Sequence, residues 1–150
     1  MEVRTTLLKC ICLPAFALVA ACGEQVGPKD AEVYSLMNAS ILESTAGLNQ
    51  LECDAFRREI VSNGDLLIHA PCKYSINAEQ HAKVSAYVEK TKAMPLAFGN
   101  PMETVRRSVA AELSLKKSDE LNNHPLNVVL RYRQVANGGW DFFEVTEEGS

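Results

Sequence analysis

The spacing of apolar residues predicts helices in most of the chain and strands in its middle and at its end. Apolar side chains recur at helical spacing in residues 30–44, 51–62 and 77–95. A further helix begins at Asn100, a capping residue that is followed by proline at the first helical position. Because residues 112–116 alternate between apolar and polar, this helix either continues through them or changes to a strand near Ala111.

Alternation with a period of two predicts the strands. In residues 65–74 the apolar even-numbered positions share one face, and Pro71 indicates an edge strand or a strand end. Residues 127–136 and 140–146 flank Asn137-Gly138-Gly139, which favours a tight turn, so they predict a terminal β-hairpin. The sequence therefore predicts an α+β fold, with N-terminal helices packed on a small, mostly antiparallel sheet that ends in a β-hairpin.

The N-terminus has the parts of a secretory signal: basic residues, an apolar stretch over residues 10–19, and two alanines before Cys22. The apolar stretch is shorter than the roughly 20 residues that a membrane-spanning helix needs. Val19-Ala20-Ala21-Cys22 resembles the lipobox of bacterial lipoproteins, and this resemblance covers residues 1–23. It implies that the Cys22 sulfur carries a diacylglyceryl group, that the chain is cut before Cys22, and that the new amino terminus is acylated, for example with palmitate.

The lipoprotein resemblance also implies an organisation and a location. We expect residues 1–21 to be removed as a signal peptide, residues 22–29 to form a lipidated tether, and residues 30–150 to form one globular domain. Two or more acyl chains anchor a protein stably, so the domain is expected on the cell envelope. Gly23 is compatible with the periplasmic side of the outer membrane if the host is Gram-negative.

Charge narrows the class of partner. The whole chain has a formal charge of −4, from 19 acidic and 15 basic residues. Removal of Glu2, Arg4 and Lys9 with the signal leaves 18 acidic and 13 basic residues, a charge of −5. An acidic domain is a poor ligand for phosphate backbones, so nucleic acid is not expected as a partner.

Cys53 and Cys72 are the other cysteines of the mature chain, and export to an oxidising compartment favours a disulfide between them. We expect it to join the end of a helical region to a strand. With His69 and His81 they offer zinc ligands, but their spacing matches no standard zinc site. A catalytic cysteine would need a free thiol, which a disulfide removes. No metal or cofactor is therefore expected.

The functional prediction is a binding module. The sequence lacks a G-x-S-x-G elbow, an H-E-x-x-H helix and a phosphate-binding glycine loop, which favours binding over catalysis. Arg131, Arg133 and Trp140 lie on the terminal hairpin and are candidate contacts for an envelope protein or a cell-wall component; alternatively, Trp140 packs on the hairpin and the arginines form a solvated face.

The last third of the chain is similar to NTF2-like and cystatin-like folds, in which a helix packs on a curved sheet. This resemblance implies the alternative function, a small-ligand-binding or enzymatic domain. Its pocket would lie between helix and sheet and would be lined by His69, Tyr132 or Trp140.

Overall fold

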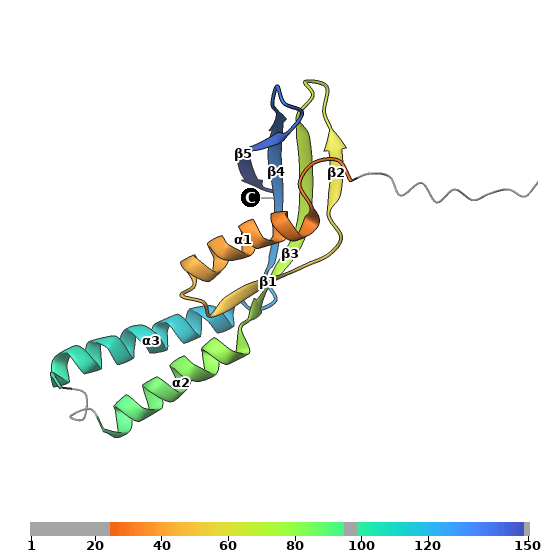
Figure 1. Ribbon diagram of the computed structural model, residues 1–150. Helices are drawn as coiled ribbons and strands as arrows, with labels where there is room; N and C mark the ends of the chain where they lie inside the picture. Colours follow the sequence, from red (N-terminus) through yellow and green to blue (C-terminus); the bar gives the residue numbers. More distant parts are fainter. Residues whose placement is uncertain (1–24, 95–98, 149–150) are drawn as a thin grey trace, which may run out of the picture.

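The computed structural model describes residues 25–94 and 99–148, in which three helices accompany a five-stranded antiparallel sheet (Figure 1). The α+β prediction is confirmed, although two of these helices lie between strands of the sheet rather than before it. In chain order the elements are α1 (Asp30–Ser44), β1 (Asn49–Cys53), β2 (Arg57–Ile60), β3 (Leu66–Ile76), α2 (Ala78–Ala93), α3 (Pro101–Leu121), β4 (Pro125–Gln134) and β5 (Trp140–Glu147).

The long strand β3 organises the sheet. β4 pairs with one edge of β3, and β5 pairs with the far side of β4. The other edge of β3 is shared by two short strands: β1 lies opposite residues 72–76, and β2 lies opposite residues 66–69. Because all of these pairs are antiparallel, neighbouring strands bring directly opposite side chains to the same face.

The hydrophobic core lies between α1 and one face of the sheet. Val33 and Met37 of α1 are buried against the even-numbered residues 66–72 of β3, which are also buried. The predicted inward faces of the two long strands are therefore confirmed. The buried core residues of β3 and β4 are Leu66, Ile68, Ala70, Cys72, Val128, Leu130 and Tyr132.

The helix expected over residues 51–62 is wrong, because this segment forms most of β1 and all of β2. β3 has 11 residues, and each of them carries backbone groups that need hydrogen-bond partners. The two short strands supply such partners along its second edge. Leu51 is buried while Glu52 is exposed, which is the two-residue period of a strand. The Cys53–Cys72 disulfide consequently joins two strands, not a helix and a strand.

The other helical predictions are confirmed. α2 begins after Asn77, whose side chain accepts a hydrogen bond from the Gln80 backbone N–H, and α3 begins after Asn100. α3 continues without interruption to Leu121, so residues 112–116 are helical. The two helices form a hairpin that extends away from the sheet (Figure 1).

The C-terminal β-hairpin is also confirmed, and β4 begins two residues before its expected start. Gly138 has φ +82°, in the left-handed region that glycine adopts readily, and the Val135 N–H donates to the Gly139 carbonyl. In chain order the register steps from Arg131–Glu144 to Tyr132–Phe142, which leaves Phe143 as an extra residue in β5. This bulge keeps Phe142 on the α1 side of the sheet and places Phe143 on the opposite side.

Candidate binding surfaces

The face of the sheet that carries α1 is only partly covered by this helix. Between α1 and β5 an apolar groove of about 280 Å³ remains open, and we call it the α1/β5 groove. Its outer residues Leu36, Phe142 and Val145 are 49%, 48% and 54% exposed. The groove is lined by Leu36, Met37, Ser40, Leu51, Leu126, Val128, Leu130, Phe142 and Val145.

The volume and chemistry of this groove restrict what fits in it. Pockets for drug-sized ligands range from about 300 to 1,000 Å³ and usually combine apolar walls with a few convergent polar groups. The groove lies at the lower limit of that range, and Ser40 is the polar side chain of its lining. It therefore suits apolar side chains of a partner. None of His69, Tyr132 and Trp140, which the ligand-binding alternative places in its pocket, lines it.

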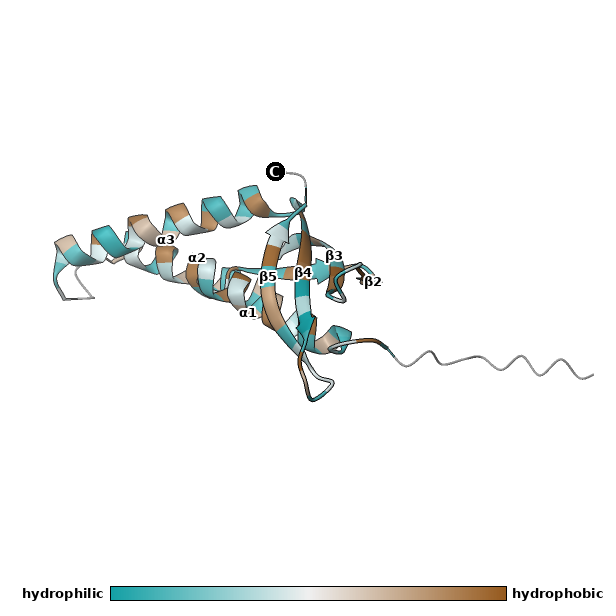
Figure 2. Cartoon of the chain, turned by 90° about the horizontal axis from the view of Figure 1, so that it is seen from above, coloured by the Kyte–Doolittle hydropathy of each residue, from teal (hydrophilic) through white to brown (hydrophobic). Residues whose placement is uncertain are grey.

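A second apolar surface lies on α3. Met102, Val105, Val109 and Leu113 form one stripe, with exposed fractions of 80%, 52%, 50% and 62%. We call it the α3 stripe; the apolar segments that recur along α3 are brown in Figure 2. At 100° per residue, the centre of this stripe lies about 145° around the helix from the centre of its buried residues, which are Thr104, Ser108 and Ser118.

The contact between α2 and α3 explains this orientation. The hydroxyl of Thr91 donates to Ser108 Oγ at 2.9 Å, and both residues are buried. Lys92 Nζ bonds Glu112 Oε1 at 3.1 Å farther along the hairpin. Small and polar residues of α3 thus contact α2 at these points, and the four apolar residues of the stripe point outward. The reverse arrangement is usual for a helix whose apolar face covers a core.

Polar contacts also attach α3 to the sheet. The buried Asn49 side chain donates to the Ser118 carbonyl at 3.1 Å, and Ser118 Oγ lies 3.5 Å from the Leu48 carbonyl. His81 at the start of α2 lies 3.1 Å from Asp119 Oδ1. A pocket of about 370 Å³ lies beside this junction. These contacts fix the base of the hairpin, so the direction of the α3 stripe follows from the fold.

Arg131, Arg133 and Trp140 do not form one site. Arg131 Nε lies 2.6 Å from Oδ2 of the buried Asp65, and its hydrogen bond is the main reason that the pKa of this carboxyl is lowered, with Asn63 and Arg133 contributing. Arg133 is exposed, and its guanidinium lies 4.2 Å from the centre of the Phe143 ring. Trp140 lies on the opposite face and packs against the core. Arg133 is thus the most exposed of the three side chains.

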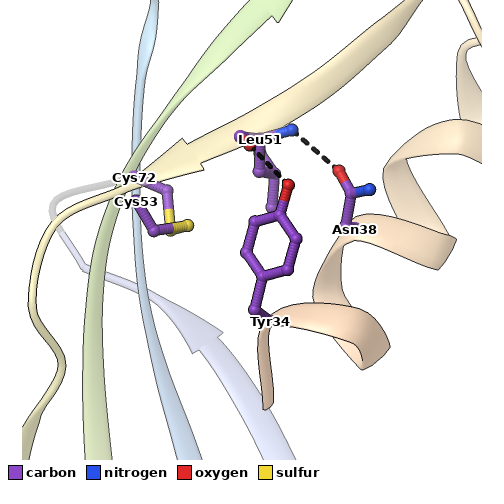
Figure 3. Close-up of a disulfide and its surroundings, with 5 residues drawn as sticks. All are labelled: Tyr34, Asn38, Leu51, Cys53 and Cys72. Atoms are coloured by element: carbon purple, nitrogen blue, oxygen red, sulfur yellow. Dashed lines mark hydrogen bonds between the residues drawn. A yellow bond between two sulfur atoms is a disulfide. The ribbon is translucent and has the colours of Figure 1, made fainter. Parts of the chain in front are cut away.

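The disulfide lies beside the core on the α1 side of the sheet (Figure 3). Cys53 and Cys72 are directly opposite in the β1–β3 ladder, with their Cα atoms 4.0 Å apart. On β1 the Leu51 carbonyl accepts a hydrogen bond from the Tyr34 hydroxyl at 2.9 Å, and the Leu51 N–H donates to Asn38 Oδ1 at 2.8 Å. Side chains of α1 therefore satisfy the backbone of β1 next to the disulfide.

The structure separates the four residues that were considered for zinc. Cys53 and Cys72 are bonded to each other, and His69 lies on the other face of β3 from Cys72. The ring nitrogens of His69 are 3.7 Å from Glu59 Oε2 and 3.8 Å from Glu148 Oε2. His81 lies at the base of the hairpin. Within residues 25–94 and 99–148, no three His, Cys, Asp or Glu side chains are grouped to hold a metal ion.

The lipoprotein signal stays a prediction from the sequence. The lipobox and Cys22 lie outside the described residues. In the part of the chain that the structure describes, no helix has the length and hydropathy needed to cross a membrane. The chain matches no family model, no curated protein and no solved structure. The similarity to NTF2-like and cystatin-like folds therefore stays a prediction.

Proposed function

We propose that this chain is a membrane-anchored bacterial lipoprotein whose domain works by binding another protein at the cell envelope. The observation that carries the proposal is the presence of two uncovered apolar surfaces, the α1/β5 groove and the α3 stripe, on one domain. Contiguous exposed apolar surface with polar surroundings is typical of interaction sites. Attachment through acylated Cys22 would keep these surfaces close to the membrane and to envelope partners.

The face of the sheet that points away from α1 offers a separate polar and aromatic surface in this proposal. Arg133 and Phe143 are exposed there, and arginine and aromatic residues are enriched at protein interfaces. Arg131 supports this face by its bond to Asp65. Trp140 lies on the face that carries the α1/β5 groove, where it packs against the core.

Cross-linking in living cells tests the binding activity. A tagged full chain is cross-linked and captured from membranes, and its partners are identified by mass spectrometry. The wild type is compared with Val109→Lys/Leu113→Lys on the α3 stripe and with Ile60→Lys, an exposed apolar residue outside both surfaces. A partner that is captured by the wild type and the Ile60 variant, but lost from the stripe variant, supports the proposal. If the wild type and both variants capture the same set of proteins, the proposal is contradicted.

Fractionation tests the anchor separately. Cys22→Ser removes the sulfur that the lipobox would acylate. The variant should leave the membrane fraction or keep its signal peptide, whereas Cys53→Ala/Cys72→Ala should stay membrane-bound. Unchanged membrane association and processing of the Cys22 variant would refute lipidation.

A further inference from the structure

We infer that the partner of these surfaces is a second copy of the chain: the α3 stripe of each copy docks in the α1/β5 groove of the other. This inference rests on the proposed binding function and names its partner. Two copies that exchange their helical hairpins in this way form a dimer with two equivalent contacts. Three observations on the described residues support this inference. They are the part of the sheet face that α1 leaves open, the similar lengths of the stripe and the groove floor, and the charges beside both surfaces.

The open part of the sheet face is the first observation. α1 covers one part of a sheet face, and the groove beside it has apolar residues of β4 as its floor. A helix that lies on this floor next to α1 would complete the layer, because helices pack on sheets with their apolar stripe facing inward. α3 has such a stripe and uses its opposite face to contact α2. It can therefore enter a groove without leaving its own hairpin.

The lengths of the two surfaces agree. From Met102 to Leu113 the stripe spans 11 steps along α3, or about 16 Å at 1.5 Å per residue. From Leu126 to Leu130 the floor of the groove spans four steps along β4, or about 14 Å at 3.4 Å per residue. Phe142 adds apolar surface at the side of this floor. The stripe and the floor of the groove are thus of similar length.

The charges beside the two surfaces agree with this pairing. Arg106, Glu112 and Lys116 lie along the edges of the stripe. The ion-pair partners of Arg106 and Lys116 are Glu103 and Glu120 of α3 itself, which form weak surface pairs with them. The groove has acidic flanks: Glu43 lies seven residues after Leu36 on the same side of α1, and Glu147 follows Val145 on the same face of β5. Pairing stripe with groove would bring Arg106 and Lys116 toward these acidic flanks, whereas two paired stripes would bring together charges of both signs.

Symmetry closes the assembly. A contact between unlike surfaces produces open chains of molecules unless a rotation closes it. When each copy both gives its α3 stripe and receives that of its partner, a two-fold axis relates the two contacts and no apolar surface is left at an end. The inference is therefore a dimer and not a filament.

Sedimentation equilibrium of the full chain in mild detergent tests the dimer. Wild type and Ile60→Lys should have twice the protomer mass. The stripe variant is Val109→Lys/Leu113→Lys, and a groove variant is Leu36→Lys/Val145→Lys. The dimer dissociation constant of each should be at least tenfold higher than that of the wild type. All four substituted residues are about half exposed or more, so folding should be kept, as checked by circular dichroism. If either lysine pair prevents folding, serine at the same two positions replaces it.

Mixing the two variants identifies the pairing. The groove variant keeps an intact stripe and the stripe variant keeps an intact groove, so their mixture should recover a dimer held by one of the two contacts. A groove variant that stays fully dimeric would show stripe-to-stripe pairing and overturn the inference. A wild type that remains monomeric at all concentrations would also overturn it. In that case, loss of another envelope protein from the stripe variant in cells would leave the proposed binding function standing.

Discussion

Opening the Cys53–Cys72 disulfide should destabilise the fold mainly through the unfolded chain. The two cysteines are 19 residues apart in sequence, and a cross-link that closes a loop of this size lowers the entropy of the unfolded chain by an amount worth about 3 kcal/mol at 25 °C. In the folded state the same residues are held opposite each other by the β1–β3 ladder. The native strands should therefore stay paired without the bond, while the unfolded state gains freedom.

Urea unfolding followed by circular dichroism measures this loss. The test compares Cys53→Ala/Cys72→Ala with the parent, both beginning at residue 22 and carrying Cys22→Ser so that no other thiol is present. The double variant should have a free energy of unfolding about 3 kcal/mol lower. Reductant should lower the free energy of unfolding of the parent by a similar amount and leave that of the double variant unchanged. A difference below about 1 kcal/mol would refute the reasoning.

Three further changes test the core, the buried ion pair and a close backbone contact. Ile68→Ala, at a fully buried position, should cost about 2–5 kcal/mol in urea unfolding. Because the pKa of Asp65 is lowered in the fold, its carboxylate stabilises the folded state above the unfolded pKa near 4. This stabilisation is lost as the pH falls through the lower pKa of the folded state. Asp65→Asn should therefore flatten the decline in the free energy of unfolding that is measured from pH 6 to pH 2. Gly27→Ala would place a Cβ against Leu66 Cδ2, so it should cost clearly more than Gly64→Ala, where φ is also positive but no atom is near and the left-handed backbone costs about 1–2 kcal/mol.

Elements with strong local signals could be predicted from the sequence. The terminal hairpin combines alternating strands with a glycine-containing turn, and α2 and α3 begin at asparagine caps that the structure confirms. The disulfide followed from the cysteine count and the expected compartment, and the structure places Cys53 opposite Cys72. In each case the residues that determine the feature are close in sequence or few in number.

Features that depend on distant partners could not be predicted. Residues 51–62 have apolar positions at helical spacing, but the free edge of β3 draws them into strands, and only the folded sheet reveals that edge. Met102, Val105, Val109 and Leu113 recur at helical spacing in the sequence. This spacing does not give the direction of the α3 stripe, which depends on contacts such as Thr91 to Ser108. The α1/β5 groove exists because α1 leaves part of a sheet face open, and no local pattern encodes that.

Site-specific cross-linking from the α3 stripe in living cells tests the central claim most directly. A photoreactive residue replaces Val109 in the full chain, with the same residue at Ile60 as the matched control. We predict a cross-linked dimer from position 109, with the linked peptide mapping to β5 or α1 of a second copy, and no such product from position 60. Equal and weak cross-linking from both positions would contradict the conclusion that the uncovered apolar surfaces of this domain bind a partner.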